Sequence, residues 1–215
     1  MAILVDDLVD SVSVTLLDTQ HRGWPRSELL IYLREALAAT AGAQPNMYPL
    51  QEFVPLQAGI TQVLPDGGVA LLEVQFNEVS GRVVRGPVDR DLLDEANRYW
   101  PAATQETDVW DYAADPRDPR RFAVTPPNNG LGSVQVLYGA VPTVTGSSGE
   151  SLDIAESYRP AFVEYMLGKA YMKNSKSRDP VKSQTHMQTW GTLVGLKVRG
   201  QQFFAPKAPG AEVKA

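Results

Sequence analysis

The 215-residue chain contains no cysteine. It therefore has no disulfide framework, no thiolate zinc site and no cysteine nucleophile. It also lacks a long apolar run, because no segment approaches the roughly 20 residues that span a bilayer. The start MAILVDDLVD has no basic segment ahead of a long apolar one. We therefore expect a soluble protein without export or membrane association, stabilised by burial or assembly.

Residues and motifs for catalysis are also scarce. His21 and His186 are the only histidines, so a site with two histidine ligands requires both to converge from distant segments. The G-x-S-x-G motif of serine hydrolases is absent, and GSSGES at 146–151 is predicted to be a linker. Residues 121–142, RFAVTPPNNGLGSVQVLYGAVP, lack the lysine of a P-loop and the glycine spacing of a dinucleotide loop. Their asparagines and glycines favour a turn between two strands.

Charge is divided unevenly along a chain whose formal net charge is -5. Residues 1–150 hold 20 acidic residues against 10 arginines and no lysine, whereas residues 151–215 hold 10 basic residues against 5 acidic ones. The acidic excess argues against a general nucleic-acid binder, which needs clustered Lys and Arg. This asymmetry indicates either two surfaces that contact different neighbours, or charged residues that merely face solvent and are unevenly distributed by chance.

Helical spacing marks the two ends of the chain. Apolar residues of one helical face recur in residues 2–17, although the β-branched run SVSVT weakens this helix. A second helix follows Gly23, with Pro25 at its first position and Glu28 in its first turn. Further helices are predicted from residue 158 and, after Asp179, from residue 180.

The middle of the chain has strand character, with short alternating runs separated by prolines and glycines. A hairpin turning at Ser80–Gly81 and a short helix ended by Pro101 are also expected. The predicted strands cover residues 52–56, 61–64, 70–77, 82–88, 109–113, 122–125 and 133–138.

This order predicts an α+β fold. The terminal helices, within residues 1–43 and 151–198, are expected to form a four-helix bundle. Residues 44–150 form a β-rich insertion, and residues 199–215 an extended C-terminal arm too rich in proline and glycine for a helix.

Three residue groups suggest chemistry and also have simpler interpretations. Asp89, Asp91 and Asp94 have spacing like a calcium loop but lack its turn glycine and distal glutamate, so a solvated helix start is favoured. A carboxylate pair for glycan hydrolysis depends on a distance that sequence does not give. The four tryptophans are scattered, so core packing is favoured over stacking on sugars or bases.

Five stretches together resemble head-to-tail adaptor (connector) proteins of tailed bacteriophages, especially short-tailed ones. Each is weak alone, but their order and spacing span most of the chain. The stretches are WPRSELLIYLREAL at 24–37, GITQVLPDGGVALLEVQFN at 59–77, DPRRFAVTPP with the following VQVLYGAVP, YRPAFVEYMLGKAYMKNSKS at 158–177, and HMQTWGTLVGLK at 186–197.

This resemblance implies a structural role without catalysis, cofactor or metal. The protein would form a ring, twelve-fold in such a family, between the portal protein and the tail proteins. Genomic DNA would pass through its channel without specific binding. The implied location is the virion, after assembly in the host cytoplasm.

In such a family the C-terminal segment commonly reaches the portal. Phe203 and Phe204 stand out because two adjacent phenylalanines in a loose tail need a groove to enter. The residues predicted to contact the portal are Lys197, Arg199, Gln201, Phe203, Phe204, Pro206 and Lys207.

Three other functions stay open at this stage. One is another virion connector or tail-completion protein. Another is a carbohydrate- or host-binding β-module, which would carry an aromatic platform on one sheet face. The third is a glycan hydrolase, which would need a cleft with converging carboxylates.

Overall fold

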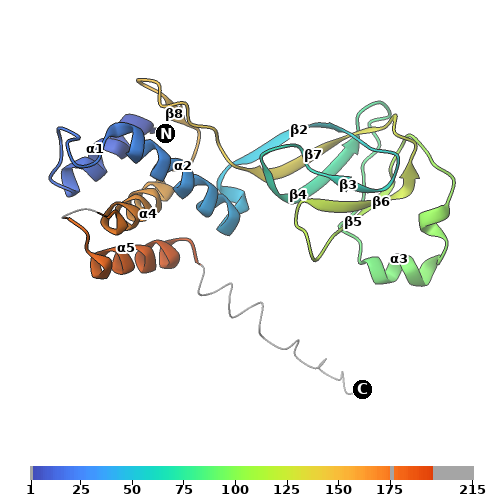
Figure 1. The fold of residues 1–215 in the computed structure, drawn as a ribbon. Coiled ribbons are helices and arrows are strands. Elements are labelled where there is room, and N and C mark those ends of the chain that lie inside the picture. Colours follow the sequence, from blue (N-terminus) through green and yellow to red (C-terminus); the bar gives the residue numbers. More distant parts are fainter. Residues whose placement is uncertain (1, 175–176, 196–215) are drawn as a thin grey trace, which may run out of the picture.

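The computed structural model describes residues 2–174 and 177–195 and shows a mixed helix and sheet fold (Figure 1). The helices α1, α2, α4 and α5 form a helical part at one end, and strands β2 to β7 with the helix α3 form a β part at the other. The predicted α+β class is confirmed. None of the helices in the described ranges combines the length and apolarity needed to cross a membrane.

The first two helices begin where the sequence signals them. Helix α1, Val5–Thr15, follows the two-residue strand β1, Ile3–Leu4, and keeps its helical backbone despite the β-branched run. Helix α2, Arg26–Ala43, has Pro25 as its N-cap, one position before the predicted place. Both helices bury the predicted apolar stripe, because positions three and four apart share one helical face.

The last two helices meet at a glycine. Helix α4, Arg159–Met172, packs against α1, α2 and α5, and α5 is Pro180–Leu193. A Cβ on Gly168 would lie 2.7 Å from the Met187 sulfur, so glycine permits this close approach. The Ser183 hydroxyl donates a 2.7 Å hydrogen bond to the Gly168 carbonyl.

The prediction of a four-helix bundle is not supported. Five α-helices occur in the described residues, and α3 belongs to the β part. The terminal helices are arranged around α4, and α5 lies against α4 with Ser183 as its only buried residue within the helix. Met187 and Trp190 of α5 lie against Gly168 and Tyr165 of α4. Because these side chains are only partly buried, α5 covers the core from outside and does not contribute to a shared bundle interior.

The helical part has its own core, which includes the short antiparallel pair of β1 with β8, Ser151–Leu152. The Trp24 indole is buried there and donates to the Ala170 carbonyl at 3.2 Å. The fully buried apolar members are Val5, Leu8, Val9, Val12, Leu29, Leu33, Ala36, Leu37, Ala41, Phe162, Met166 and Ala170.

The β part consists of two three-stranded antiparallel sheets. One has the order β2–β7–β4 and the other β3–β6–β5. The register of β2 with β7 runs without interruption from Pro49 opposite Gly139 to Pro55 opposite Ser133. The strand bounds are β2 Pro49–Pro55, β3 Gly59–Val63, β4 Gly68–Asn77, β5 Asp111–Ala114, β6 Arg121–Asn128 and β7 Ser133–Ala140.

Side chains of both sheets form a second core. Alternate residues of a strand face the same side, so Val134 and Val136 of β7 point inward together, as do Phe122 and Val124 of β6. Tyr112 of β5 is buried in the same cluster. The β part therefore closes around a core distinct from that of the helical part.

Two predictions in this part need adjustment. The turn at Ser80–Gly81 exists, with Gly81 at φ +66°. Residues 82–88, however, make only isolated bridges, including Arg85 with Asp111, and form no regular strand. Helix α3, Arg90–Ala96, forms where the short helix is predicted and is capped by the Asp89 carboxylate, which accepts from the Asp91 N–H. Pro101 does not end it as predicted, because the helix stops at Ala96 and Pro101 lies in a separate 3-10 helix, Trp100–Ala102.

The chain crosses between the two parts at neighbouring points. It leaves α2 through the short 3-10 helix Pro45–Met47 into β2, and it returns from β7 through residues 141–150. Gly139 lies against the outgoing segment, and a Cβ there would approach the Pro45 carbonyl oxygen to 2.4 Å. The two crossings therefore share one strand pair (Figure 1).

Candidate assembly surfaces

The predicted portal-contacting residues Lys197, Arg199, Gln201, Phe203, Phe204, Pro206 and Lys207 lie outside the described residues. The structure describes the chain up to Gly195, which has φ +70°. Helix α5 ends at Leu193, and the carbonyl of its C-cap Val194 accepts a 2.9 Å hydrogen bond from the Gln44 side-chain amide. The Trp190 indole donates to the Thr40 hydroxyl at 3.2 Å. The C-terminal end of α5 is therefore tied to the end of α2.

The α4 lysines do not form a free positive surface. Lys169 pairs with Glu35 at 2.8 Å and Lys173 with Glu28 at 2.5 Å. Burial alone would raise the pKa of Glu28, but hydrogen bonds from Lys173 and Tyr32 outweigh burial and hold the pKa below its ordinary value. These ion pairs join α4 to α2. Two of the basic residues of the C-terminal region are therefore neutralised by acidic residues of the same chain.

A cleft with exposed apolar side chains lies at the end of the helical part where α1 stops. Leu17, which is 92% exposed, lines it with Trp24 and Tyr171. The rest of the lining is largely polar, and Val181, next to Lys182 in the chain, is 75% exposed. The His186 ring stacks on Tyr171 with centroids 5.5 Å apart. Exposed apolar side chains beside a cleft are typical of a contact surface.

The turn between β6 and β7 explains the asparagines and glycines of residues 128–132. The buried Asn128 side chain accepts from the Gly130 and Gly132 N–H groups at 2.8 and 3.2 Å and donates to the Thr107 carbonyl at 2.8 Å. Gly130 has φ +84°, whereas Asn128 and Asn129 do not adopt positive φ. The stretch is the end of a sheet, as predicted, and its polar groups are used by the turn itself.

The segment 146–151, predicted to be a linker, contains a hydrogen-bonded loop. The Glu150 carboxylate accepts from the Thr145 and Gly146 N–H groups at 2.9 and 2.7 Å. These hydrogen bonds hold the pKa of Glu150 below its ordinary value. Asp6 of α1 accepts from the Gly149 N–H at 2.9 Å, which attaches the loop to the helical part.

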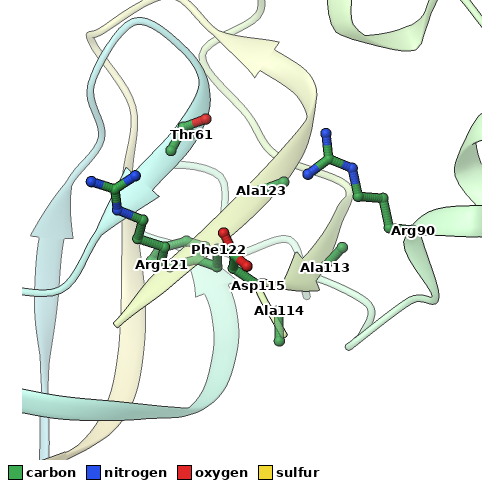
Figure 2. A pocket seen from close by; sticks show the side chains of 8 residues that line it. All are labelled: Thr61, Arg90, Ala113, Ala114, Asp115, Arg121, Phe122 and Ala123. Atoms are coloured by element: carbon green, nitrogen blue, oxygen red, sulfur yellow. The ribbon is translucent and has the colours of Figure 1, made fainter. Parts of the chain in front are cut away.

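A shallow groove lies on the outer face of the β3–β6–β5 sheet. Figure 2 shows Arg90 and Arg121 on opposite sides, with the Asp115 carboxylate, Phe122 and several small side chains between them. Thr61 and Ala113 both lie opposite Ala123 in the strand register, so these small residues form a row across three strands. The groove is not a free basic site, because Asp115 is part of its lining and Arg121 pairs with Asp118 at 3.4 Å.

A second groove lies between α3 and the β5–β6 edge, and we call it the tryptophan groove. Its lining residues are Asn97, Trp100, Ala103, Thr104, Glu106, Trp110, Thr125 and Pro126. Trp110 is 45% exposed, whereas Trp100 is buried and donates to Asp94 at 2.7 Å. Sequence reasoning missed this groove, because the two tryptophans line it together only when the segment between them folds back on β6.

The remaining residue groups have structural partners. His21 Nδ1 lies 3.4 Å from the Ser13 hydroxyl, and His186 Nδ1 lies 2.8 Å from Glu164. Phe53 and Phe76 meet edge to face, with an interplanar angle of 75°, and so present no flat stacking platform. Within the described ranges, no three His, Cys, Asp or Glu side chains gather as a metal ion would require.

These features describe a protein with several separate contact surfaces, which is the character of a structural adaptor. The family model of the SU10 adaptor protein matches residues 4–210, which include both parts. The chain therefore belongs to the SU10 adaptor protein family and is a bacteriophage adaptor, a virion component. Membership implies a non-catalytic role and contacts with portal and tail proteins in general. No curated protein matches the chain.

Proposed function

We propose that this adaptor forms a ring between the portal and the tail proteins of a short-tailed phage and continues the DNA channel. The observation that carries this proposal is the family match, which spans the helical part, the β part and most of the C-terminal segment. The proposed ring has twelve copies and assembles in the host cytoplasm.

The fold supports a division of labour within the ring. The helical and β parts have separate cores, so each part can form its own contact surface for a different partner. We propose that residues 1–43 and 151–198 form the ring and face the portal, and that residues 44–150 face the tail proteins. The exposed apolar surface around Leu17 is the proposed contact between neighbouring copies.

Reconstitution with purified portal rings tests the proposal. We expect particles with one adaptor per portal subunit, visible as a second ring by electron microscopy and measurable by native mass. A protein that binds tail proteins but never the portal would instead be a tail-completion protein. Binding to neither would contradict the proposed role.

The arm is proposed to anchor the adaptor to the portal through Phe203 and Phe204. Burial of one phenylalanine contributes about 1.5–3 kcal/mol before ordering costs, so two can anchor the segment. Deletion of residues 199–215 should leave a folded helical protein that no longer binds the portal. Unchanged binding would reject the anchor, and circular dichroism controls for folding.

We also propose that some acidic side chains of residues 1–150 face the channel and repel DNA phosphates. Such repulsion acts over a Debye length of roughly 8–10 Å. Basic residues outside the α4 ion pairs are proposed to face an acidic portal surface. Portal binding should then weaken as salt is raised, and salt-independent binding would contradict this electrostatic contribution.

A further inference from the structure

Most outer edges of the two sheets in the β part are covered or interrupted. The segment 82–88 lies along two of them: the Val84 N–H donates to the Gln75 carbonyl of β4 at 2.8 Å, and the Val88 N–H donates to the Tyr112 carbonyl of β5 at 2.8 Å. Strand β3 has five residues and an irregular register, and both features discourage the addition of another strand. Strand β2, seven residues long with an unbroken register, is the remaining open edge among the described residues.

Alternate residues of β2 direct their main-chain groups away from β7. At both ends an even-numbered residue bonds to the strand opposite: the Tyr48 carbonyl accepts from the Ala140 N–H at 3.0 Å, and the Leu56 N–H donates to the Gly132 carbonyl at 2.8 Å. Bonded and non-bonded pairs alternate along an antiparallel ladder, and the register between these ends is continuous. The odd-numbered residues of β2 therefore turn their N–H and C=O groups outward.

Two prolines frame the open positions. Pro49 and Pro55 both have odd numbers, as expected, because a strand tolerates proline where the N–H would point away from the ladder. Between them, Gln51 and Phe53 are exposed, and their main-chain N–H and C=O groups have no hydrogen-bond partner in the described part of the chain. Outward N–H and C=O groups with this spacing are matched by the backbone of another extended strand.

A row of apolar side chains crosses the outer face of the same sheet. Phe53, which is 42% exposed, meets Phe76 of β4 edge to face, with ring centroids 5.9 Å apart. Val83 lies opposite Phe76 in an isolated bridge and is 69% exposed. Directly opposed residues share one face of a sheet. A strand added beside β2 would therefore place a side chain next to Phe53 and extend this row.

The neighbouring Glu52 adds a charge preference. Its side chain is exposed and accepts from the Tyr138 hydroxyl at 2.5 Å. None of the ion pairs within the described residues includes Glu52. Opposite charges on directly opposed residues of two strands attract. Because adjacent residues of a strand face opposite sides, the added strand should carry a basic residue next to an apolar one.

We propose that a short extended strand of a tail protein pairs with the open edge of β2, with an apolar residue opposite Phe53 and a basic residue opposite Glu52. This inference rests on the proposed function, in which residues 44–150 face the tail proteins, and it adds the type of contact. The edge of a second copy suits this position poorly. Pairing of β2 with β2 is two-fold symmetric, which does not build a ring, and the register that uses both outward N–H groups places Glu52 opposite Glu52.

Proline substitution tests the pairing, because it removes one outward N–H and leaves the bonds to β7 in place. We expect Gln51→Pro to weaken the binding of purified tail proteins to the full-length adaptor at least about tenfold. Gln51→Ala loses the same side chain but keeps the N–H, and should bind within about threefold of the unaltered protein. Val63→Pro, at an outward position of the β3 edge, is the matched control and should not change binding. Thermal unfolding and portal binding check that each variant is folded.

Two further measurements connect the effect to β2. Phe53→Thr keeps a residue suited to a strand but removes the ring, and should weaken tail binding about tenfold. Hydrogen exchange of the Gln51 and Phe53 amides should slow at least about tenfold when tail proteins bind. Equal binding by Gln51→Pro and Gln51→Ala would overturn the proposal. Slow exchange of these amides in adaptor–portal particles without tail proteins would also overturn it, because another copy or the portal would then cover the edge.

The same assays separate this site from the proposed ring. An adaptor that binds tail proteins with the Gln51→Pro defect but never binds the portal supports the strand site and contradicts the ring. An adaptor that binds the portal but no tail protein contradicts the strand site and leaves the portal contact standing.

Discussion

The buried Asn128 side chain provides the sharpest test of how the β part is held. It makes three hydrogen bonds, to the Gly130 N–H, the Gly132 N–H and the Thr107 carbonyl. Each such bond contributes about 1 kcal/mol net. Asn128→Ala should therefore lower the free energy of unfolding of the β part by about 3 kcal/mol, a large fraction of the 5–15 kcal/mol typical of a protein.

Urea unfolding followed by hydrogen exchange of residues 121–140 measures this effect. With a urea dependence of about 1–3 kcal/mol per M, the midpoint should fall by about 1–3 M. Asn129→Ala is the matched control, because its side chain also bonds within the turn but the residue is less buried. Asn129→Ala should lower the free energy of unfolding by less than about 1 kcal/mol. An equal loss of stability in both variants would contradict the role of the Asn128 hydrogen bonds.

Two further predictions concern packing and pH. Gly139→Ala places a Cβ against the Pro45 carbonyl and should cost about 1–3 kcal/mol, whereas Gly42→Ala in α2, with open space around its Cβ position, should stabilise by up to about 1 kcal/mol. Thermal unfolding distinguishes the two, and equal melting temperatures would contradict the contact. Glu28 has a lowered pKa, so its stabilisation is present above its ordinary value of 4.5 and is lost as pH falls through the folded-state value. In the Glu28→Gln variant, the melting temperature should fall less between about pH 5 and about pH 3. If it falls as much as in the unaltered protein, the pH dependence comes from other carboxylates.

Local patterns in the sequence were sufficient for most elements. Val5, Leu8 and Val12 lie on one face because of helical spacing, and all three are fully buried. Alternation in residues 133–138 likewise predicted the inward side chains of β7. These signals succeed because the pattern and the buried face arise from the same short segment.

Features that depend on distant contacts were not predictable in this way. The close approach of α5 to α4 depends on Gly168, which a sequence shows only as one glycine within a helix. Trp100 and Trp110 line one groove only after residues 101–109 fold back. The strand pairing that places β7 between β2 and β4 likewise depends on contacts between residues that are 57 to 90 positions apart, from Asn77 with Val134 to Pro49 with Gly139.

The paired crossings at β2 and β7 have a mechanical consequence. A load applied to the β part reaches the helices through two hydrogen-bonded strands instead of a single tether, and Gly139 packed on Pro45 limits twisting of that joint. If the proposed ring forms, a displacement of the β part is therefore passed directly to the helical part, and the two parts move together.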